Sequence, residues 1–296
     1  MDTRLLRTFL TLARTESFTA TAAALHLAQS TVTVQIRSLE KELGTRLVDR
    51  LPRGALLTDA GRRVVEEAEA VLDAEARLRA SATAGGPPTG QVVLGAGETL
   101  CSARLPKVIA ALRRSCPGVE VSLQPSDTAA AVEGLRTGRL DLALLLEEDP
   151  QVPQIVTEHI ADEPLVLVCS PEHPMARREA PAEWRDLAPE PFFLHEPGCS
   201  YSDRLAHRLS QAGEARTRVT RFGSIEAARS CVAAGLGLTV LPRSTVEESL
   251  RMGRLAVVPG PEIPDVPVRL ARNQRRWTSP AAQAVADEIR RQLRAE

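Results

Sequence analysis

The stretch TATAAALHLAQSTVTVQIRSLEKELG, residues 19–44, decides the fold of the first part of the chain. Its centre, TVTV, alternates hydroxyl and apolar side chains, which on its own is typical of a strand. Its flanks are rich in alanine, leucine and glutamate, which favour a helix. On a helix with ~100° per residue, one face collects Val32, Ile36, Leu39 and Leu43. The helical interpretation explains the pattern as far as Leu43, so we predict a helix.

The opposite face of this helix is polar and carries short side chains. It holds Ser30, Val34, Arg37 and Lys41, flanked by Thr31, Thr33 and Ser38. A short alanine-rich helix with Thr19 as its N-cap and a turn at residues 27–29 would precede it, which predicts a helix-turn-helix. Hydroxyls, an amide and cations on the second helix suit phosphates and base edges, and short side chains let a helix approach DNA closely. The alternative is a packed helical bundle in which these hydroxyls are merely exposed.

The composition is that of an ordinary globular chain: 296 residues, 43% apolar and 25% charged. No apolar run approaches the ~18 residues of a membrane span, and the N-terminal segment lacks the apolar core of a signal peptide. We therefore expect a cytoplasmic protein without a membrane partner. Residues 1–63 hold ten Lys or Arg against six Asp or Glu, while the whole chain carries −1. A basic first domain is compatible with nucleic-acid binding.

Cysteine and histidine usage gives no sign of a metal or disulfide framework. The five cysteines have no C-x-x-C pair, and the five histidines have no ligand spacing. In a cytosolic chain such cysteines are expected to be free thiols. We predict neither a metal site nor a cofactor.

The chain divides at its glycine and proline pairs. A long charged helix is expected from about residue 59 to 81, and it ends at the linker TAGGPPTG, residues 83–90. Strands and helices alternate beyond the linker, which predicts a mostly parallel sheet with crossover helices. A second α/β set begins at EPLVLVCS, residues 163–170, so two lobes are the natural grouping.

The N-terminal motif as a whole resembles the winged helix-turn-helix of LysR-type transcriptional regulators. The matching residues are Ser17, Phe18, Thr19, Ala23, Ala24, Leu25, His26, Gln29, Ser30, Val32, Gln35, Ile36, Leu39, Glu40, Leu43, Gly44, Leu47, Val48, Asp49, Arg50, Leu57, Thr58, Asp59, Ala60 and Gly61. The resemblance implies a winged helix-turn-helix, a long linker helix, and a two-lobed α/β domain like periplasmic solute-binding proteins. It implies a regulator that binds promoter DNA and is switched by a small-molecule effector in the cleft between the lobes.

The same resemblance implies a division into domains. Residues 1–58 would be the DNA-binding domain and residues 59–89 the dimerisation helix and hinge. Residues 90–296 would bind the effector, with lobe I at about 90–161 and 266–296, and lobe II at about 162–265.

The resemblance also assigns DNA contacts by position. The expected major-groove residues are Gln29, Ser30, Thr33 and Val34; the minor-groove residue is Arg53, at the tip of the wing; the phosphate contacts are Thr31, Arg37 and Arg50. Val34 departs from the family, in which this position is usually basic or a polar donor. Because valine cannot form a hydrogen bond to a base, it would only touch a thymine methyl or pack passively.

The long helix carries an apolar stripe that needs a partner. The stripe consists of Val64, Ala68, Val71, Leu72, Ala74, Leu78 and Ala82. In the family this helix pairs with its twin, which predicts a dimer or tetramer on pseudo-palindromic DNA. The alternative is that the helix packs against its own effector domain.

Loops after strand ends are the expected effector site, because open α/β sheets bind ligands there. GAGETLCS, residues 95–102, begins like a dinucleotide fingerprint but has Leu100 where the third glycine belongs. Thr99 at this loop, and Thr128 at the next, would instead help helix N-termini to hold an anionic or polar ligand. Each could also be an ordinary N-cap. The resemblance places both at the cleft.

The second lobe would complete the ring. The expected residues are Cys199, Ser200, Tyr201, Phe222 and Ser224. Hydroxyls at helix starts on both lobes suggest a small, carboxylate-like effector. The alternative for Cys199 is peroxide sensing, as in some regulators of this family, although Cys231, the next cysteine along the chain, lies within an apolar helix pattern.

Catalysis is not expected. The chain has no G-x-S-x-G, no P-loop, no metal-ligand spacing and no complete dinucleotide fingerprint. A further alternative to a regulator is a cytosolic small-molecule-binding module whose N-terminal helices serve only oligomerisation.

Overall fold

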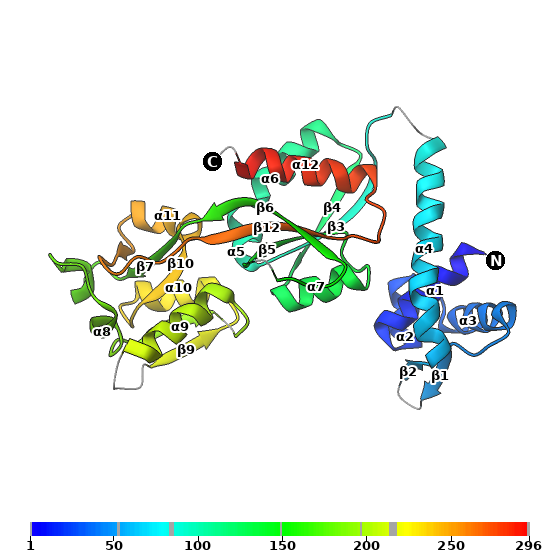
Figure 1. The fold of residues 1–296 in the computed structure, drawn as a ribbon, viewed down its shortest axis with the longest axis horizontal. Helices are drawn as coiled ribbons and strands as arrows, with labels where there is room; N and C mark the ends of the chain where they lie inside the picture. Colours follow the sequence, from blue (N-terminus) through cyan, green and yellow to red (C-terminus); the bar gives the residue numbers. More distant parts are fainter. Residues whose placement is uncertain are drawn as a thin grey trace. The chain divides into compact units, whose positions relative to one another are not determined.

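The computed structural model describes residues 2–51, 54–82, 86–148, 150–195, 197–212 and 218–294. Its contacts divide the chain into two compact units (Figure 1). The first contains Met1–Gly86 and Arg275–Ser279, and the second Pro87–Gln274 and Pro280–Glu296. Among the described helices, none has the length and apolar character needed to cross a membrane.

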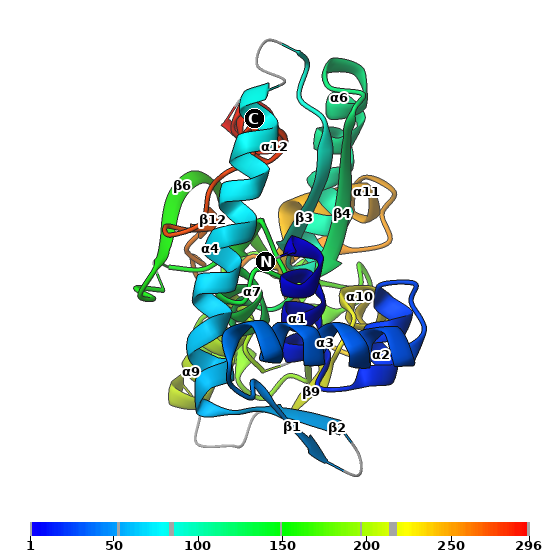
Figure 2. The ribbon, with the colours of Figure 1, turned by 90° about the vertical axis from the view of Figure 1, so that its right-hand side faces the viewer.

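The first unit is a helix-turn-helix with a two-stranded wing and a long helix (Figure 2). Its elements are α1 (Thr3–Thr15), α2 (Phe18–Ala24), α3 (Gln29–Leu43), β1 (Val48–Leu51), β2 (Gly54–Leu57) and α4 (Asp59–Ala82). The strands β1 and β2 pair antiparallel. The sequence had suggested Thr19 as the N-cap of α2, and this expectation is wrong. Ser17 holds that place because its backbone is extended and its hydroxyl accepts a hydrogen bond from the Ala20 N–H.

The helix predicted through the TVTV segment is confirmed as α3. Val32, Ile36 and Leu39 are almost fully buried in one core with residues of α1, α2, β1 and α4. Burial of each such side chain is worth ~1.5–3 kcal/mol, which outweighs the weak helix propensity of valine and threonine. Tertiary packing on a 3.6-residue period therefore decides this segment.

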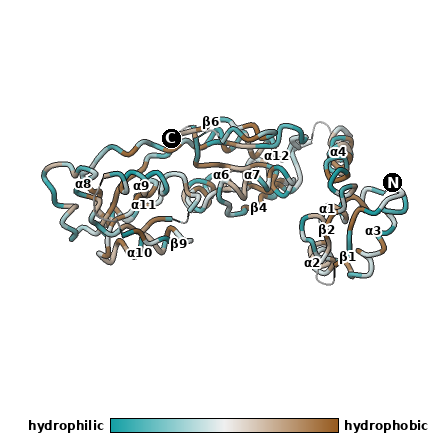
Figure 3. The backbone as a smooth tube through the Cα atoms, turned by 60° about the horizontal axis from the view of Figure 1, so that its bottom comes forward, coloured by the Kyte–Doolittle hydropathy of each residue, from teal (hydrophilic) through white to brown (hydrophobic). Residues whose placement is uncertain are grey.

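The helix α4 packs along only part of its apolar stripe. Ala68 is buried in the core of the first unit, and Val64 and Leu72 lie partly buried against it. In contrast, Val71 is 38% exposed and Leu78 71% exposed. The tube in Figure 3 alternates between hydrophobic and hydrophilic colours along α4. The apolar stripe thus extends beyond the residues that the core of this unit covers.

Lobe I of the second unit is a five-stranded mixed sheet with helices on both faces. Its elements are β3 (Gly90–Ala96), α5 (Glu98–Ala103), α6 (Leu105–Ser115), β4 (Val119–Pro125), α7 (Thr128–Arg136), β5 (Leu142–Leu146), β6 (Ile155–Glu163), β12 (Val266–Asn273) and α12 (Pro280–Arg294), with strand order β4-β3-β5-β12-β6. The strands β3, β4 and β5 are parallel, as expected. The strand β12 runs antiparallel to both of its neighbours, β5 and β6, so the sheet is mixed where a mostly parallel one was predicted.

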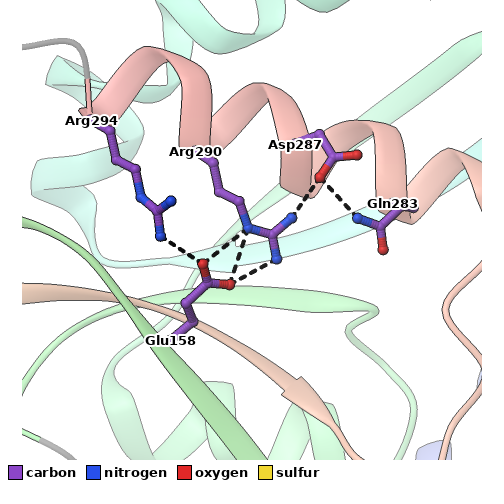
Figure 4. Close-up of polar contacts among 5 residues, drawn as sticks. All are labelled: Glu158, Gln283, Asp287, Arg290 and Arg294. Carbon is purple, nitrogen blue, oxygen red and sulfur yellow. Dashed lines mark hydrogen bonds and ion pairs between the residues drawn. The ribbon is translucent and has the colours of Figure 1, made fainter.

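Alternation along β5 shows how this sheet is buried on both faces. Leu142 and Leu144 belong to one core, with residues of α6 and α12, while Ala143 and Leu145 belong to another, with residues of α7. At the edge of the sheet, α12 is tied to β6 by charge (Figure 4). Glu158 accepts hydrogen bonds from Arg290 at 2.8 Å and from Arg294 at 2.8 Å. The strand β5, buried on both faces, appears in the sequence as the continuous apolar run LALLL, as buried parallel strands usually do.

Lobe II is built from two small sheets and their covering helices. Its elements are β7 (Leu165–Cys169), α8 (Trp184–Leu187), β8 (Phe192–His195), α9 (Ser200–Ala212), β9 (Val219–Phe222), α10 (Ile225–Ala233), β10 (Thr239–Pro242), α11 (Arg243–Arg251) and β11 (Ala256–Val257). The strand β7 pairs antiparallel with β10 and β11, whereas β8 and β9 are parallel. Two chain passages join the lobes: β6 leads into β7, and β11 leads through residues 258–265 into β12.

Candidate functional site

The exposed face of α3 is the candidate nucleic-acid interface. Gln29, Ser30 and Arg37 are exposed, Thr31 and Thr33 are partly exposed, and Val34 is 60% exposed. The N-cap of α3 is Ala28, whose side chain offers no capping hydrogen bond. The backbone N–H groups of the first turn are therefore available to a phosphate or a base edge. A helix whose buried face is fixed by packing presents these groups on a rigid element.

The wing is attached to α2 through Arg50. Its guanidinium lies 5.1 Å from the centroid of the Phe18 ring, in a cation–π arrangement. Arg50 is exposed, so the contact orients the side chain without burying its charge. Arg53, the expected minor-groove residue, lies outside the described residues.

Glu40 connects the recognition helix to the wing. Its Oε1 accepts hydrogen bonds from the N–H of Leu47 at 2.9 Å and of Val48 at 3.2 Å. These N–H groups belong to the chain that enters β1. One carboxylate therefore sets the position of the wing relative to α3, and sequence reasoning had not given Glu40 a role.

A cavity of about 520 Å³ lies between the two lobes of the second unit. The expected residues Thr99, Thr128, Cys199, Ser200 and Tyr201 all line it. Phe222 and Ser224 are not among its described lining residues. The Phe222 ring stacks on Phe193 with centroids 6.0 Å apart, and Ser224 turns its hydroxyl toward Glu98.

Thr99 and Thr128 are not N-caps, which excludes the simpler alternative for both. Gly97 caps α5 and Asp127 caps α7. Thr99 is buried, and its hydroxyl lies 3.5 Å from that of Tyr201 on the other lobe. The Thr128 hydroxyl donates to Glu147 at 3.3 Å. Both side chains therefore belong to the cavity wall.

Three further hydrogen bonds join the lobes across the cavity. The Ser200 hydroxyl of lobe II donates to the carbonyl of Leu146 in lobe I at 2.7 Å. In the opposite sense, Glu98 of lobe I accepts the N–H of Ile225 in lobe II at 3.1 Å and the Ser224 hydroxyl at 3.4 Å. A ligand between the lobes would act directly on these contacts.

Cys199 and His195 form an ionisable pair in the cavity wall. Burial raises the pKa of the Cys199 thiol, but hydrogen bonding to His195 and Ser202 outweighs it and holds the pKa below its usual value. The hydrogen bond with Cys199 raises the pKa of His195; burial opposes this, and Glu98 adds to it. Nε2 of His195 lies 3.5 Å from Glu98 Oε2, longer than an ordinary hydrogen bond.

Sequence reasoning missed Glu98, Asp127 and His195, which also line the cavity. Glu98 and Asp127 each stand next to a threonine that was singled out, so their position was a usable signal. His195 ends β8 and lies only four residues before Cys199, so its position too was a usable signal. Among the described residues, no group of three His, Cys, Asp or Glu is placed to hold a metal ion.

Comparison with protein families matches both units. Residues 3–62 match the bacterial regulatory helix-turn-helix protein of the lysR family. Residues 85–294 match the LysR substrate binding domain.

Individual relatives are similar to this chain over most of its length. The chain is 32% identical to YwqM, an uncharacterized HTH-type transcriptional regulator of Bacillus subtilis (strain 168), over 98% of this chain and 99% of the relative. It is 34% identical to a hydrogen peroxide-inducible genes activator of Pectobacterium carotovorum subsp. carotovorum, over 83% and 81%. Full-length OxyR from Pseudomonas aeruginosa shares the fold with TM-score 0.77 and 27% identity, over 98% of this chain and 95% of that one. The chain belongs to the LysR family and is a DNA-binding transcriptional regulator with an effector-binding domain.

Proposed function

We propose that this regulator binds promoter DNA as a dimer or tetramer, with α3 in the major groove and the wing against the minor groove. Residues 1–58 supply the DNA-binding domain, residues 59–89 the dimerisation helix and hinge, and residues 90–296 the effector domain. The observation that carries the proposal is α3 itself: a packed inner face and an exposed outer face of short polar side chains. We place its action in the cytoplasm.

Specific roles follow from the exposed groups. Gln29, Ser30 and Thr33 reach base edges, and Val34 contributes only an apolar surface. Thr31, Arg37 and Arg50 contact phosphates, and Arg53 enters the minor groove. The exposed Val71 and Leu78 of α4 support pairing of this helix with its twin in a second copy.

The cavity between the lobes holds the effector. Its occupant changes the contacts of Glu98 and Ser200 across the cavity, and through them the relative positions of the lobes. In a symmetric oligomer such a change alters the spacing of the paired DNA-binding domains. The regulator therefore couples a ligand equilibrium to operator binding.

A gel-shift titration with the promoter region of its own gene tests this function. We expect site-specific binding that weakens steeply with salt, because phosphate contacts release counterions. Arg37→Gln lowers the affinity, whereas Arg113→Gln, on the exposed surface of α6, does not. If neither Arg37→Gln nor Thr33→Ala alters DNA binding, the N-terminal helices serve only oligomerisation and the proposal fails.

A second candidate function, a response to peroxide, is favoured by the Cys199–His195 pair. Attack of the Cys199 thiolate on hydrogen peroxide would form a sulfenate and release water, with the peroxide as oxidant. A mass increase of one oxygen on Cys199 after mild peroxide, absent in Cys199→Ser, supports it. An unmodified Cys199 in protein that still binds its operator excludes it.

A further inference from the structure

The described wall of the inter-lobe cavity carries acids and no strong base. Glu98 and Asp127 line it, and no lysine or arginine stands among its described lining residues. Glu147 lies beside it through its hydrogen bond with Thr128, and burial raises the pKa of this carboxyl. His195 is the remaining described lining side chain that can become cationic. The fixed side-chain charge of the described wall is therefore negative at neutral pH.

Two of the helix N-termini at the cavity are already matched by carboxylates of the chain itself. Asp127 Oδ1 accepts the Ala130 N–H of α7 at 2.7 Å. Glu98 Oε2 accepts the Ile225 N–H, which opens α10, at 3.1 Å. An anionic ligand at either helix would have to displace one of these carboxylates, because both would compete for the same donors.

Two arginines of lobe II, Arg204 and Arg221, pair with acids outside the cavity lining. Arg221 lies 2.8 Å from Asp203 and donates to the His195 carbonyl at 2.9 Å. Arg204 lies 3.6 Å from Glu148. Neither arginine belongs to the described cavity lining, so neither offsets its acids there.

The remaining wall is partly apolar and partly lined by hydroxyls, those of Thr99, Thr128 and Ser200 among them. Pro125, Leu144 and Ile225 contribute to its apolar part, and the volume of about 520 Å³ is large enough for a small organic molecule. A ligand in this cavity would remove the half-buried Glu98 and the exposed Asp127 from water. Its apolar body would meet the apolar wall, and a cationic head is favoured because the opposite charge compensates carboxylates that lose water.

We infer that the effector is a small organic cation, an ammonium group carried on a short apolar body, held by Glu98 and Asp127. This inference rests on the proposed effector role of the cavity and names the class of its ligand. It replaces the carboxylate-like effector suggested by the hydroxyls alone, since that suggestion took no account of the two acids.

The single tyrosine of the chain makes the test local. Tyr201 is the one tyrosine in the sequence and it lines the cavity, so full-length protein made with 3-fluorotyrosine gives one ¹⁹F signal from this site. Three probes with the same tail are titrated at pH 7 and constant ionic strength: 4-phenylbutylamine, 4-phenylbutanol and 4-phenylbutyrate. The amine is fully protonated at this pH. We expect the amine to bind at least about tenfold more tightly than the alcohol, and the carboxylate to bind most weakly.

Isosteric variants locate the charge. Glu98→Gln and Asp127→Asn keep an acceptor for the helix N–H groups and remove one charge each. Each should weaken amine binding at least about threefold and leave alcohol binding unchanged. Glu262→Gln and Asp265→Asn remove the same groups from exposed positions outside the cavity lining, and they should preserve the order of the three probes.

The outcomes distinguish failure of the cationic effector from failure of the cavity as an effector site. Binding of the carboxylate as tight as that of the amine, or an amine affinity unchanged in both isosteric variants, overturns the cationic effector and leaves the effector cavity standing. No response of the ¹⁹F signal to any of the three probes rejects the cavity as a small-molecule site, and the inference with it. Should Glu98→Gln fail to fold, Asp127→Asn and the wild-type order still decide.

Discussion

The carboxylate of Glu98 accepts the backbone N–H of Ile225 at 3.1 Å, and these residues lie on different lobes of the effector domain. Glu98 opens α5 directly after the strand β3, and Ile225 opens α10. Ser200 makes the reciprocal tie, from lobe II to the Leu146 carbonyl. Besides the two chain passages between the lobes, single hydrogen bonds around the cavity thus tie the lobes together, and a single substitution can remove one of them.

Glu98→Ala should loosen the lobes. The change removes the acceptor of the Ile225 N–H, and loss of a partner by a partly buried donor costs ~1–3 kcal/mol. Because the Glu98 side chain is 36% exposed, water replaces part of the contact, and we expect the low end of this range. Calorimetry should show the effector-domain transition lowered by roughly 2–4 °C. Glu98→Gln should lose less than half as much, and an equal loss in both variants would show that the hydrogen bond is not what matters.

Glu40→Ala should weaken DNA binding although Glu40 is not one of the proposed DNA contacts. The carboxylate holds the two N–H groups that lead into β1, so its loss frees the wing from α3. We expect the affinity for operator DNA to fall about tenfold, the equivalent of ~1.4 kcal/mol. Fluorescence anisotropy measures this, and Glu42→Ala, an exposed position on the same helix, is the control. Equal affinities of the two variants would contradict the role of Glu40.

Cys199 should be alkylated faster than Cys101 and Cys169. Its pKa is lowered, whereas burial raises that of Cys101 and raises that of Cys169 to about 11. Since the thiolate is the nucleophile, iodoacetamide at pH 7 should label Cys199 first. His195→Asn removes the group that stabilises the thiolate and should slow labelling at least about threefold. Peptide mass spectrometry follows each site, and an unchanged rate in His195→Asn would show that the pair is not coupled.

Glu158→Gln should destabilise lobe I in a pH-dependent way. Hydrogen bonds from Arg290 lower the pKa of Glu158 below its ordinary value of 4.5, so the ion pair stabilises the fold above that pH. The contribution is lost as pH falls through the folded-state pKa. Because Glu158 is 39% exposed, solvent screening limits the difference at pH 7 to ~0.5–1 kcal/mol. Urea unfolding of the two proteins should differ at pH 7 and converge below pH 4.5; a constant difference would exclude the ionised carboxylate as the cause.

Much of the DNA-binding unit could be predicted from the sequence, because its information is local. The spacing of Val32, Ile36 and Leu39 defines the buried face of α3, and the exposed face follows from it. The start of α2 was placed two residues late, since Ser17 and Thr19 are both good N-caps and only the extended backbone at Ser17 distinguishes them. Glu40 could not be assigned, because its partners lie across a turn whose path depends on the wing.

The cavity was harder to predict, because its wall comes from distant segments. Thr99, Thr128 and Cys199 were reached from loops after strands, and the fold brings them together. Phe222 was expected in the wall, but its ring stacks on Phe193 instead. The charge of the wall depends on which arginines pair with which acids, as Arg221 does with Asp203, and such pairing is not visible in a linear pattern.

The most direct test is the operator specificity of α3 variants, measured by anisotropy as the ratio of affinities for operator and scrambled DNA at several salt concentrations. If the exposed face of α3 contacts bases, Gln29→Ala and Thr33→Ala each reduce this ratio. The difference in binding free energy between operator and scrambled DNA then shrinks by roughly 1–3 kcal/mol per lost base contact. Arg37→Gln instead lowers both affinities together and reduces the salt slope by about one per subunit. A specificity ratio unchanged in both Gln29→Ala and Thr33→Ala would contradict the assignment of α3 as the recognition helix.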